Sequence, residues 1–353
     1  MDEKALRETG ERLILWYRAH RRDLPWRRKR TPYRVWVSEV MLQQTAVSTV
    51  IPYFERWVER FPGVRALAAA EEREALAQWE GLGYYQRARR LHSAARKVVE
   101  EHDGRIPRRE SDLRELPGVG PYIAAAILSF AFGEDKVALD ANVVRVFMRL
   151  LAIHGTGSEA AVRRRVGSAA ASAMPPGRSA DYNQALMDFG SAICLPRSPR
   201  CGECFVTDRC RAFAAGEQYD IPEPRPKRLK DIRTAIAVFR REGRVYIQKR
   251  PDDGLFAGMW EFPGGKVRDG ERPAEAAVRE CREEVGVACT VDEKLTELTH
   301  YYTVFRVRLH AFLCSPDGRP PEDRTHRWVA VSKLERYPMP SANRQVVQAL
   351  NRR

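Results

Sequence analysis

The sequence predicts a chain of two domains, an all-α domain followed by an α+β domain. From residue 31 to about residue 213, apolar residues recur at helical spacing, interrupted by turns that contain glycine and proline. A proline-rich basic stretch at residues 221–228 then ends this pattern. Beyond residue 231, short runs of alternating apolar residues surround one helical stretch. A length of 353 residues also exceeds what one hydrophobic core ordinarily serves.

We expect the helical domain to span residues 1–215, a basic linker residues 216–230 and the second domain residues 231–353. Within the second domain, residues 234–239 and 245–248 alternate as strands do on either side of a turn at Glu242 and Gly243. Residues 273–284 have helical spacing, and residues 298–313 are rich in strand-forming residues. These segments together predict the α+β class.

The composition is that of a globular protein in a reducing compartment. Apolar residues make up 44% of the chain, and no apolar run approaches the roughly 18 residues of a membrane-spanning helix. Residues 1–10 lack the apolar segment of a secretory signal. We therefore expect a cytoplasmic protein without membrane contact, whose seven cysteines do not form a disulfide framework.

The charge is strongly basic and unevenly distributed. The formal net charge is +14, and most of the excess lies before residue 231. Six basic residues between positions 21 and 30 surround Trp26. A basic cluster with an aromatic residue is typical of a surface that binds a polyanion such as nucleic acid, although a solvated surface has the same composition.

Four cysteines lie close together with the spacing C-x6-C-x2-C-x5-C, and they are Cys194, Cys201, Cys204 and Cys210. Four neighbouring thiolates can saturate a metal ion or a cubane cluster. The spacing therefore predicts a metal–thiolate site and leaves zinc and iron–sulfur as alternatives. The remaining cysteines, at positions 281, 289 and 314, are widely scattered and form no such pattern.

A glycine-rich turn precedes the apolar helix expected at residues 123–132. Gly118 and Gly120 allow backbone N–H groups to face outward at a helix N-terminus, a geometry that binds a phosphate without reading sequence. Further along, Asp140 opens another helix, which we expect to reach residue 151. Two interpretations of Asp140 stand beside each other: a helix N-cap, or a carboxylate that stabilises a cationic sugar.

These features together resemble the helix–hairpin–helix glycosylases of the endonuclease III superfamily. The hairpin motif would span residues 113–132 and the iron–sulfur loop residues 194–210. Residues 38–45 (Ser-Glu-Val-Met-Leu-Gln-Gln-Thr) and 81–85 (Gly-Leu-Gly-Tyr-Tyr) are similar to the signature of the adenine DNA glycosylase (MutY) family. The resemblance implies a base-excision enzyme that carries a [4Fe–4S] cluster and acts as a nucleoid-associated monomer on double-stranded DNA.

The resemblance also implies a role for each matching polar residue. Glu39 would protonate adenine, because burial in a mainly apolar helix between residues 35 and 47 would raise the pKa of its carboxyl. Asp140 would stay ionised and stabilise or attack the oxocarbenium sugar. Tyr122 and Asn142 would orient Asp140 and the water. Tyr122 stands where bifunctional relatives carry a Schiff-base lysine, so the enzyme would be monofunctional.

Further residues match positions that contact DNA or the extruded base in the family. Those expected to contact DNA are Gln44, Leu82, Tyr84, Gly118 and Gly120, with Thr303 in the second domain. Those expected to line the adenine pocket are Arg22, Trp26, Arg27, Leu42 and Val47. Because Leu82 and Tyr84 lie in a glycine-rich loop, we expect them to be free of core packing. Ala141 departs from the family by replacing the glycine of Asp-Gly-Asn.

The second domain resembles MutT-like pyrophosphohydrolases, and residues 265–287 fit the Nudix box throughout. Glu280, Glu283 and Glu284 recur at i, i+3 and i+4, the spacing that places Mg²⁺ ligands on one helix face. In adenine glycosylases this domain recognises 8-oxoguanine, and residues 302–304 (Tyr-Thr-Val) here replace the family's Phe-Ser-His loop. A second hypothesis is that the intact box also hydrolyses an oxidised nucleoside triphosphate. The alternative is an acidic face that only supports the fold.

The prediction is an enzyme that removes adenine opposite 8-oxoguanine or guanine, and two rivals stand against it. One is a superfamily member that removes mismatched thymine or an oxidised pyrimidine. Glu39 in its motif and the Nudix-like domain argue against this rival. The other is a DNA-damage binding protein without turnover, or a nucleotide hydrolase with a helical adaptor. The presence of Glu39, Tyr122 and Asp140 together argues against an inactive protein.

Overall fold

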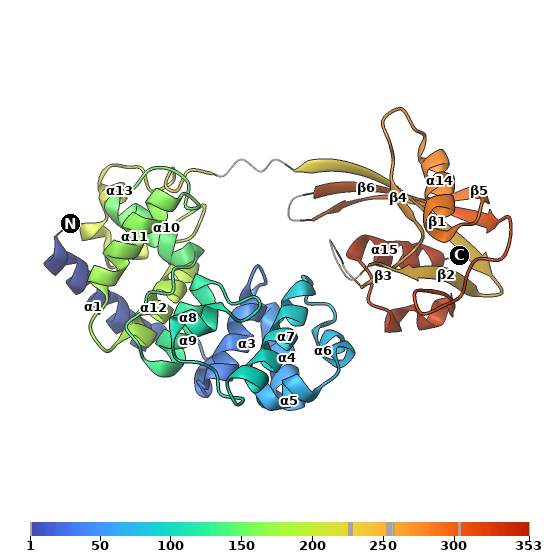
Figure 1. Cartoon of the computed structure of the whole chain (residues 1–353). Coiled ribbons are helices and arrows are strands. Elements are labelled where there is room, and N and C mark those ends of the chain that lie inside the picture. The colour runs from blue at the N-terminus through green and yellow to red at the C-terminus, as the bar shows by residue number, and fades with distance from the viewer. Residues whose placement is uncertain (1, 225–228, 252–255, 257, 303–304, 353) are drawn as a thin grey trace. The chain divides into compact units, whose positions relative to one another are not determined.

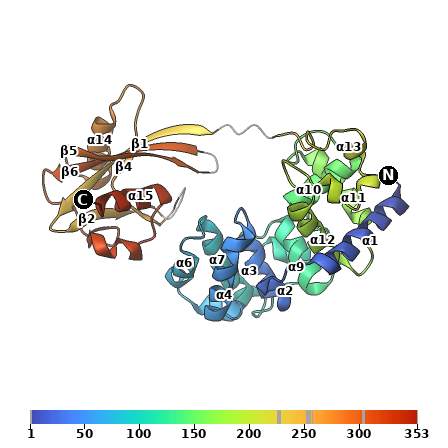
Figure 2. The same cartoon turned by 180° about the vertical axis from the view of Figure 1, so that it is seen from behind.

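The computed structural model describes residues 2–224, 229–251, 256, 258–302 and 305–352. It divides into two compact units, Met1–Arg225 (unit 1) and Pro226–Arg353 (unit 2). Figures 1 and 2 show helices in unit 1 and a sheet with packed helices in unit 2. The predicted order of an all-α part and an α+β part is confirmed.

The helices described in unit 1 enclose two large hydrophobic cores and one small cluster of alanines. The first core contains the buried rings of Phe54, Trp57 and Trp79, and the second contains those of Tyr17 and Phe147. The helix α9 packs against α3 of the first group and α12 of the second, so it joins the two. The elements are α1 (Glu3–His20), α2 (Pro25–Arg28), α3 (Pro32–Leu42), α4 (Val47–Arg60), α5 (Val64–Ala69), α6 (Glu72–Trp79), α7 (Gln86–Glu101), α8 (Glu110–Arg114), α9 (Pro121–Phe132), α10 (Ala141–Leu151), α11 (Ala160–Ala173), α12 (Ser179–Ala192), η1 (Cys201–Glu203), η2 (Thr207–Arg209) and α13 (Arg211–Ala214).

Local signals set the ends of α3, the helix that carries Glu39. It begins at Pro32 behind Thr31, whose hydroxyl accepts a hydrogen bond from the N–H of Arg34 at 3.3 Å. It ends at Leu42, so our expectation of one helix reaching residue 47 is wrong. Gln44 adopts a φ of 57°, which a right-handed helix does not permit, and α4 starts anew three residues later.

The sheet of unit 2 has the strand order β3-β2-β1-β6-β5, with β4 paired to β1 and β7 to β2. Its strands are β1 (Lys230–Arg241), β2 (Arg244–Lys249), β3 (Trp260–Glu261), β4 (Gly264–Lys266), β5 (Cys289–Tyr301), β6 (Phe305–Pro316) and β7 (His326–Ala330). β1 runs parallel to β6 and forms an antiparallel hairpin with β2. The predicted turn at Glu242 and Gly243 is confirmed, and both residues have positive φ, at 49° and 71°.

Two cores lie on the two faces of this sheet, because successive residues of β1 point to opposite sides. Ile236 and Val238 belong to the core that α15 (Ser341–Leu350) covers. The short helix η3 (Val331–Arg336) precedes α15 in the chain. Ala237 and Phe239 belong to the core that α14 (Pro273–Val285) covers. The predicted helix at residues 273–284 is therefore confirmed as α14, the element that carries the box glutamates.

The chain after α13 stays bound to unit 1 up to residue 223. Ile221 is buried in the second core, and its carbonyl oxygen accepts a hydrogen bond from Arg149 at 2.7 Å. The backbone N–H of Glu223 donates to the carbonyl of Gly155 at 3.0 Å. Part of the stretch that we expected as a linker is thus tied to the helical unit.

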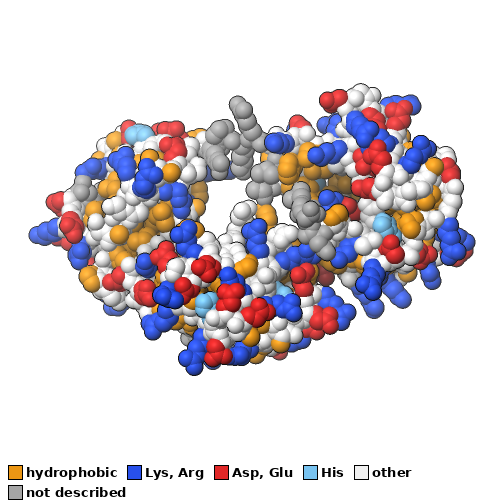
Figure 3. Space-filling view, in the orientation of Figure 1, with side chains coloured by type: hydrophobic (Ala, Val, Ile, Leu, Met, Phe, Trp, Pro, Cys, Tyr) orange, Lys and Arg blue, Asp and Glu red, His pale blue; other side chains and the backbone are white. Residues whose placement is uncertain are grey.

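Basic and acidic side chains are interspersed over the faces of both units that Figure 3 shows. In the basic cluster of residues 21–30, Arg28 pairs with Asp23 at 2.7 Å, while Arg22 and Arg27 both pair with Asp188. The protein's own carboxylates therefore neutralise part of this cluster. In the described part of the chain, no helix is both long and apolar enough to span a membrane.

Candidate active site

A cavity of about 460 Å³ in unit 1 brings together most of the residues predicted from the sequence. Its walls come from α2, α3, the turn after α3, the start of α4, α9, α10 and α12. The predicted side chains that line it are Glu39, Tyr122, Asp140, Asn142, Gln44, Arg22, Trp26, Arg27, Leu42 and Val47. Its volume falls in the usual range of small-molecule sites, so it has room for one extruded base.

Glu39 lies on the buried side of α3 with 5% of its surface exposed. Tyr122, the second residue of α9, donates its hydroxyl to Oε2 of Glu39. Burial raises the pKa of Glu39 to about 7, and the charge of Asp140 adds to this rise, whereas the Tyr122 hydrogen bond and the charge of Arg27 lower it. A carboxyl with this pKa holds a proton near neutral pH and can deliver it as a general acid.

Asp140 is a helix N-cap and also lines the cavity. Its Oδ1 accepts the backbone N–H of Val143 at 2.7 Å, and its Oδ2 accepts the side-chain amide of Asn142 at 2.7 Å. Burial raises the pKa of Asp140 above its ordinary value, while these hydrogen bonds and the charge of Arg145 oppose the rise. Ala141 is the first residue of α10, where the backbone is helical, so a methyl group fits in place of the family's glycine.

Two arginines one turn apart on α10 connect the cavity to the cysteine loop. Arg145 donates to Oδ1 of Asn142 at 2.9 Å and to the carbonyl oxygen of Cys194 at 2.9 Å. Arg149 donates to two further loop carbonyls, at 2.6 and 2.8 Å. Both arginines are buried, so these charge-assisted hydrogen bonds fix the loop against the helix that Asp140 caps.

Asp188 on α12 is a buried carboxylate that belongs to no motif. It binds Arg22 and Arg27, and Nη1 of Arg27 lies 2.7 Å from Oδ2. The side chains of Asp188 and Arg27 are only 3% and 11% exposed, so solvent screens this ion pair little. Burial alone would raise the pKa of Asp188, yet the two guanidinium groups hold it below its ordinary value. Asp188 therefore anchors both cavity-lining arginines and balances one of their two positive charges.

The α12 wall of the cavity carries three more side chains that no motif predicts: Gln184, Met187 and Ser191. Gln184 accepts a hydrogen bond from the Tyr17 hydroxyl at 3.1 Å and donates one to the carbonyl of Ala180 at 3.0 Å. Gln184, Met187 and Ser191 are spaced by three and four residues, so they share one face of α12. This spacing was the only feature of the sequence from which their common position could have been predicted. That face meets the cavity because α12 packs against α9 and α10.

Arg87, at the start of α7, binds both loops that were expected to contact DNA. Its guanidinium donates to the carbonyl oxygens of Val40 at 3.0 Å and Gln43 at 2.5 Å, at the end of α3. It also donates to the carbonyl of Gly83 at 3.2 Å and lies 5.2 Å from the ring centroid of Tyr84. One half-buried cation thereby sets the position of residues 43–45 relative to residues 82–84.

Gln44 and Tyr84 are exposed in these loops, and both have positive φ, at 57° and 51°. Leu82 is instead 5% exposed and packs in the first core. Our expectation that Leu82 is free of core packing is therefore wrong. The loop folds back on α6, with the N–H of Leu82 donating to the carbonyl of Trp79 at 3.0 Å, and this turn directs the leucine inward.

The predicted phosphate-binding turn directly precedes α9. Gly118 has a φ of 81°, which favours glycine, and a Cβ there would lie 3.0 Å from Cβ of Arg90. Gly120 is the N-cap of α9, and a Cβ at this position would meet nothing within 4 Å. Open space before the N-terminus of a helix of 12 residues is a geometry that suits a phosphate oxygen.

The four cysteines of residues 194–210 line one small, mostly apolar cavity. Burial raises the pKa of Cys204 to about 11, and the charges of the other three cysteines add to this rise. Such a set of thiols ionises together only when a metal centre balances the negative charge. The donor set therefore fits a metal–thiolate group.

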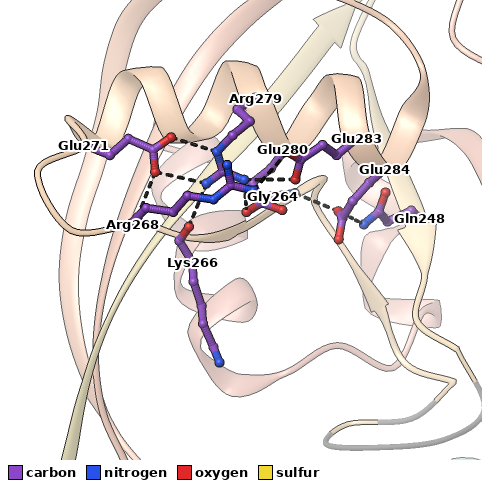
Figure 4. A network of polar contacts seen from close by, with 9 residues as sticks. All are labelled: Gln248, Gly264, Lys266, Arg268, Glu271, Arg279, Glu280, Glu283 and Glu284. Carbon is purple, nitrogen blue, oxygen red and sulfur yellow. Dashed lines mark hydrogen bonds and ion pairs between the residues drawn. The ribbon is translucent and has the colours of Figure 1, made fainter.

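The box residues of unit 2 form the polar network of Figure 4. Arg279 binds Glu280 at 2.6 Å and Glu283 at 3.0 Å. Glu284 faces the sheet, where it accepts the backbone N–H of Gly264 at 3.1 Å. The three glutamates that were expected to hold Mg²⁺ thus have different partners: two share Arg279, and the third binds β4.

The segment expected to recognise 8-oxoguanine follows β5. Thr303 lies outside the described residues. Immediately before it, the ring of Tyr302 packs against His300 with centroids 4.5 Å apart, and its hydroxyl accepts the N–H of Ala342 at 3.3 Å. Tyr301 is instead 62% exposed. The structure therefore describes a packed and an exposed tyrosine next to this position.

Comparisons with known protein families agree with this geometry. Residues 37–170 match the HhH-GPD superfamily base excision DNA repair proteins, and residues 194–210 match the iron-sulfur binding domain of endonuclease III. Residues 234–349 match the NUDIX domain. The fold and site therefore define a helix–hairpin–helix base-excision repair enzyme with an iron–sulfur cluster and a Nudix domain.

Individual similar proteins identify the family within this class of enzymes. The adenine DNA glycosylase of Rattus norvegicus is 33% identical and covers 95% of this chain and 76% of its own length. The adenine DNA glycosylase of Homo sapiens is 34% identical, with coverages of 88% and 67%. Among solved structures, a thermostable thymine-DNA glycosylase is 28% identical with a TM-score of 0.54, covering 60% of this chain and 98% of that one. The chain belongs to the adenine DNA glycosylase family.

Proposed function

We propose that this chain is a monofunctional DNA N-glycosylase that removes adenine mispaired with 8-oxoguanine or guanine. The observation that carries the proposal is that Glu39, Tyr122, Asp140 and Asn142 line one base-sized cavity. The two relatives named above that cover 95% and 88% of this chain are adenine DNA glycosylases, whereas the thymine-DNA glycosylase covers only 60% of it. This difference favours adenine over thymine as the base that enters the cavity.

Glu39 serves as the general acid. Adenine leaves poorly as an anion, so a proton must reach the base, at N7, as the glycosidic bond stretches. With a pKa of about 7, Glu39 carries that proton in a substantial fraction of molecules at neutral pH. The Tyr122 hydroxyl holds Oε2, which leaves Oε1 to deliver the proton to the base.

Asp140 stabilises the sugar while the base departs. The anomeric carbon gains oxocarbenium character, and a carboxylate next to it lowers the barrier to bond cleavage. The hydrogen bonds from Val143 and Asn142 favour the ionised carboxylate and fix its direction. Because Tyr122 offers no amine for an imine, water completes the reaction and leaves an abasic site in an unbroken strand.

The substrate is double-stranded DNA, from which the target nucleotide must leave the stack to enter the cavity. Gln44 and Tyr84 insert at the lesion with Leu82 behind them, and the turn at Gly118 and Gly120 binds a backbone phosphate. Unit 2 recognises 8-oxoguanine opposite the target, through the segment that contains Thr303. The protein works as a monomer at the nucleoid in the cytoplasm.

The iron–sulfur cluster of unit 1 is a [4Fe–4S] cluster held by Cys194, Cys201, Cys204 and Cys210. It supplies a multi-metal thiolate centre that orders a loop with little core of its own. Arg145 and Arg149 bind backbone carbonyls of the same loop, so protein contacts and thiolate ligation fix the loop together.

Base release from four defined duplexes tests this function. They carry adenine opposite 8-oxoguanine, adenine opposite guanine, thymine opposite guanine, and an oxidised pyrimidine, and strand breaks are read with and without alkali. We expect breaks at adenine alone, and only after alkali. Breaks at thymine alone would overturn the assignment, and breaks without alkali would overturn the monofunctional chemistry. Tight binding without base release would favour a damage-binding protein.

We propose a second activity for unit 2, the Mg²⁺-dependent hydrolysis of an oxidised nucleoside triphosphate. Glu280, Glu283 and Glu284 would hold the ion, which would balance the charge of the diphosphate. The observation that favours it is Gly265, where any Cβ would clash with the Glu280 carboxylate, so the glycine leaves that carboxylate room beside the sheet. The pairing of Glu280 and Glu283 with Arg279 favours the alternative, an acidic face that stabilises the fold.

Incubation of the full chain with Mg²⁺ and 8-oxo-dGTP decides between these alternatives. Release of pyrophosphate that disappears in Glu284→Gln would support the activity. No release by the unmodified protein, under conditions where it removes adenine from DNA, would leave the carboxylates with a structural role.

A further inference from the structure

Three cysteines that are far apart in the sequence meet in the interior of unit 2. Cys281 lies on α14, Cys289 begins β5, and Cys314 lies near the end of β6. Their exposed fractions are 0%, 5% and 3%, and all three belong to the core between α14 and the sheet. The helix α14, which carries Cys281, packs against β5, which Cys289 begins, while the Cys314 thiol donates to the carbonyl oxygen of Phe312 at 3.7 Å. The base-excision chemistry of unit 1 uses none of them.

Cys289 is the member of this trio that small molecules can reach. It lines a surface groove of about 650 Å³ between α14 and the start of β5, with Val278, Arg282 and Thr290 among its neighbours. Arg282 brings a positive charge to this groove, and a positive charge near a sulfur makes it more reactive. Cys289 therefore combines a path to solvent with two adjacent thiols, which an ordinary core cysteine lacks.

The strand register decides which two cysteines can be joined. In the β5–β6 ladder, Cys289 stands opposite Pro316 and Cys314 stands opposite Val291, so these cysteines are diagonal neighbours. Diagonal side chains in a ladder have Cβ atoms about 7 Å apart, whereas a disulfide needs about 4 Å. Cys281 comes from the helix packed on this face, so no ladder fixes its distance from Cys289. Of the two helix–strand pairs that the ladder leaves open, Cys281 with Cys289 is the one whose strand cysteine lines the groove.

We propose that Cys281 and Cys289 form a reversible disulfide when the protein meets hydrogen peroxide. The Cys289 sulfur attacks the peroxide and its O–O bond breaks, giving a sulfenic acid on Cys289 and one molecule of water. The Cys281 thiol then attacks the sulfenic sulfur, the S–S bond forms, and the hydroxyl leaves as a second water with the thiol proton. Two thiols lose two electrons in total and one peroxide gains them. Cellular dithiols reverse the reaction by thiol–disulfide exchange.

Peptide mapping of the full-length protein with its cluster tests the proposal. The protein is treated with hydrogen peroxide and then denatured in the presence of iodoacetamide, which alkylates the remaining free thiols. It is then digested with trypsin. Cleavage after Arg279, Arg282 and Lys294 places Cys281 in residues 280–282 and Cys289 in residues 283–294, while Cys314 falls in residues 309–324. We expect loss of the alkylated 283–294 peptide, a matching gain of the species that joins it to 280–282, and full recovery on reduction.

Variants and a reference thiol make the test decisive. The Cys314→Ala protein should still form the linked species, whereas Cys281→Ala should not. A link between residues 283–294 and 309–324 would overturn the assignment of the pair. Persistence of the alkylated 283–294 peptide, at a peroxide dose that oxidises free glutathione in the same tube, would overturn the proposal itself. The four cysteines of residues 194–210 fall in other peptides, so oxidation of the cluster does not affect this readout.

Discussion

The hydroxyl of Tyr122 donates a hydrogen bond to Oε2 of Glu39, a residue 83 positions earlier in the chain. Burial raises the pKa of Glu39 to about 7, and the tyrosine opposes that rise because it stabilises the carboxylate. Tyr122 therefore influences how readily the acid releases its proton, in addition to occupying the place where a bifunctional enzyme would carry lysine.

Replacement of Tyr122 by phenylalanine removes a donor to the carboxylate, so we expect the pKa of Glu39 to rise above about 7. The alkaline limb of the single-turnover rate should then move to higher pH, because the protonated form persists further. Rate profiles across neutral pH measure the shift. The control is Tyr182→Phe, which removes a buried hydroxyl bound to the carbonyl of Ala170 and should leave the limb in place. A limb that moved to lower pH in Tyr122→Phe would contradict this account.

Substitutions of Asp140 separate its two roles. Asparagine caps a helix as well as aspartate does, so the Asp140→Asn protein should keep the wild-type free energy of unfolding. Its rate of base removal should fall by about a hundredfold or more, because the negative charge is lost. Asp140→Ala also loses the cap and should cost about 1 kcal/mol of stability. Urea unfolding and single-turnover kinetics on the same samples measure both effects. Wild-type activity in the asparagine variant would show that the negative charge is not used.

Arg87 should act as a positioning residue for the two loops that we propose to contact DNA. Lysine keeps the charge but lacks the fork that reaches the carbonyls of Gln43 and Gly83 together, so we expect Arg87→Lys to weaken duplex binding. The expected loss of about 1.5–3 kcal/mol corresponds to a charged hydrogen bond, or tenfold to hundredfold in Kd. The matched control is Arg96→Lys at an exposed position of α7, which should bind like the wild type. Equal binding by both variants would rule out this role.

Loss of the Asp188 carboxylate should destabilise the helical unit. Asp188→Asn leaves Arg27 buried without its counter-charge, which we expect to cost about 3–5 kcal/mol of unfolding free energy. Asp181→Asn is the control on the same helix, because its ion pairs are longer and partly exposed, and it should change stability by less than about 1 kcal/mol. Chemical denaturation compares the two. If both variants lost similar, small amounts of unfolding free energy, the Asp188 carboxylate would contribute no more to stability than an exposed ion pair does.

Local patterns made much of the site predictable from the sequence. Three features each depend on a short stretch of sequence: the cysteine spacing, the glycine turn before α9 and the N-cap at Asp140. Glu39 and Tyr122 are different, because no local rule joins residues so far apart. Their common site was predicted through the family resemblance alone.

Contacts between distant residues were not predictable. Arg87 binds a carbonyl 47 residues away, and Asp188 balances an arginine 161 residues away, so neither pairing leaves a sequence pattern. The cysteines at positions 281, 289 and 314 looked unrelated for the same reason. Leu82 was misplaced because glycine content predicts a turn but does not determine which side chain the turn directs into the core.

Glu39 is proposed to deliver a proton to N7 of adenine, and removal of the acceptor atom tests this proton transfer. In a duplex with 7-deazaadenine as the target, that position is a carbon that does not accept the proton. We predict that wild-type single-turnover release falls by about 10²–10⁴-fold on this substrate, as it does for Glu39→Gln on adenine, and that combining both changes causes no further loss. Undiminished release of 7-deazaadenine by the wild type, or full additivity of the two losses, would show that Glu39 does not protonate N7.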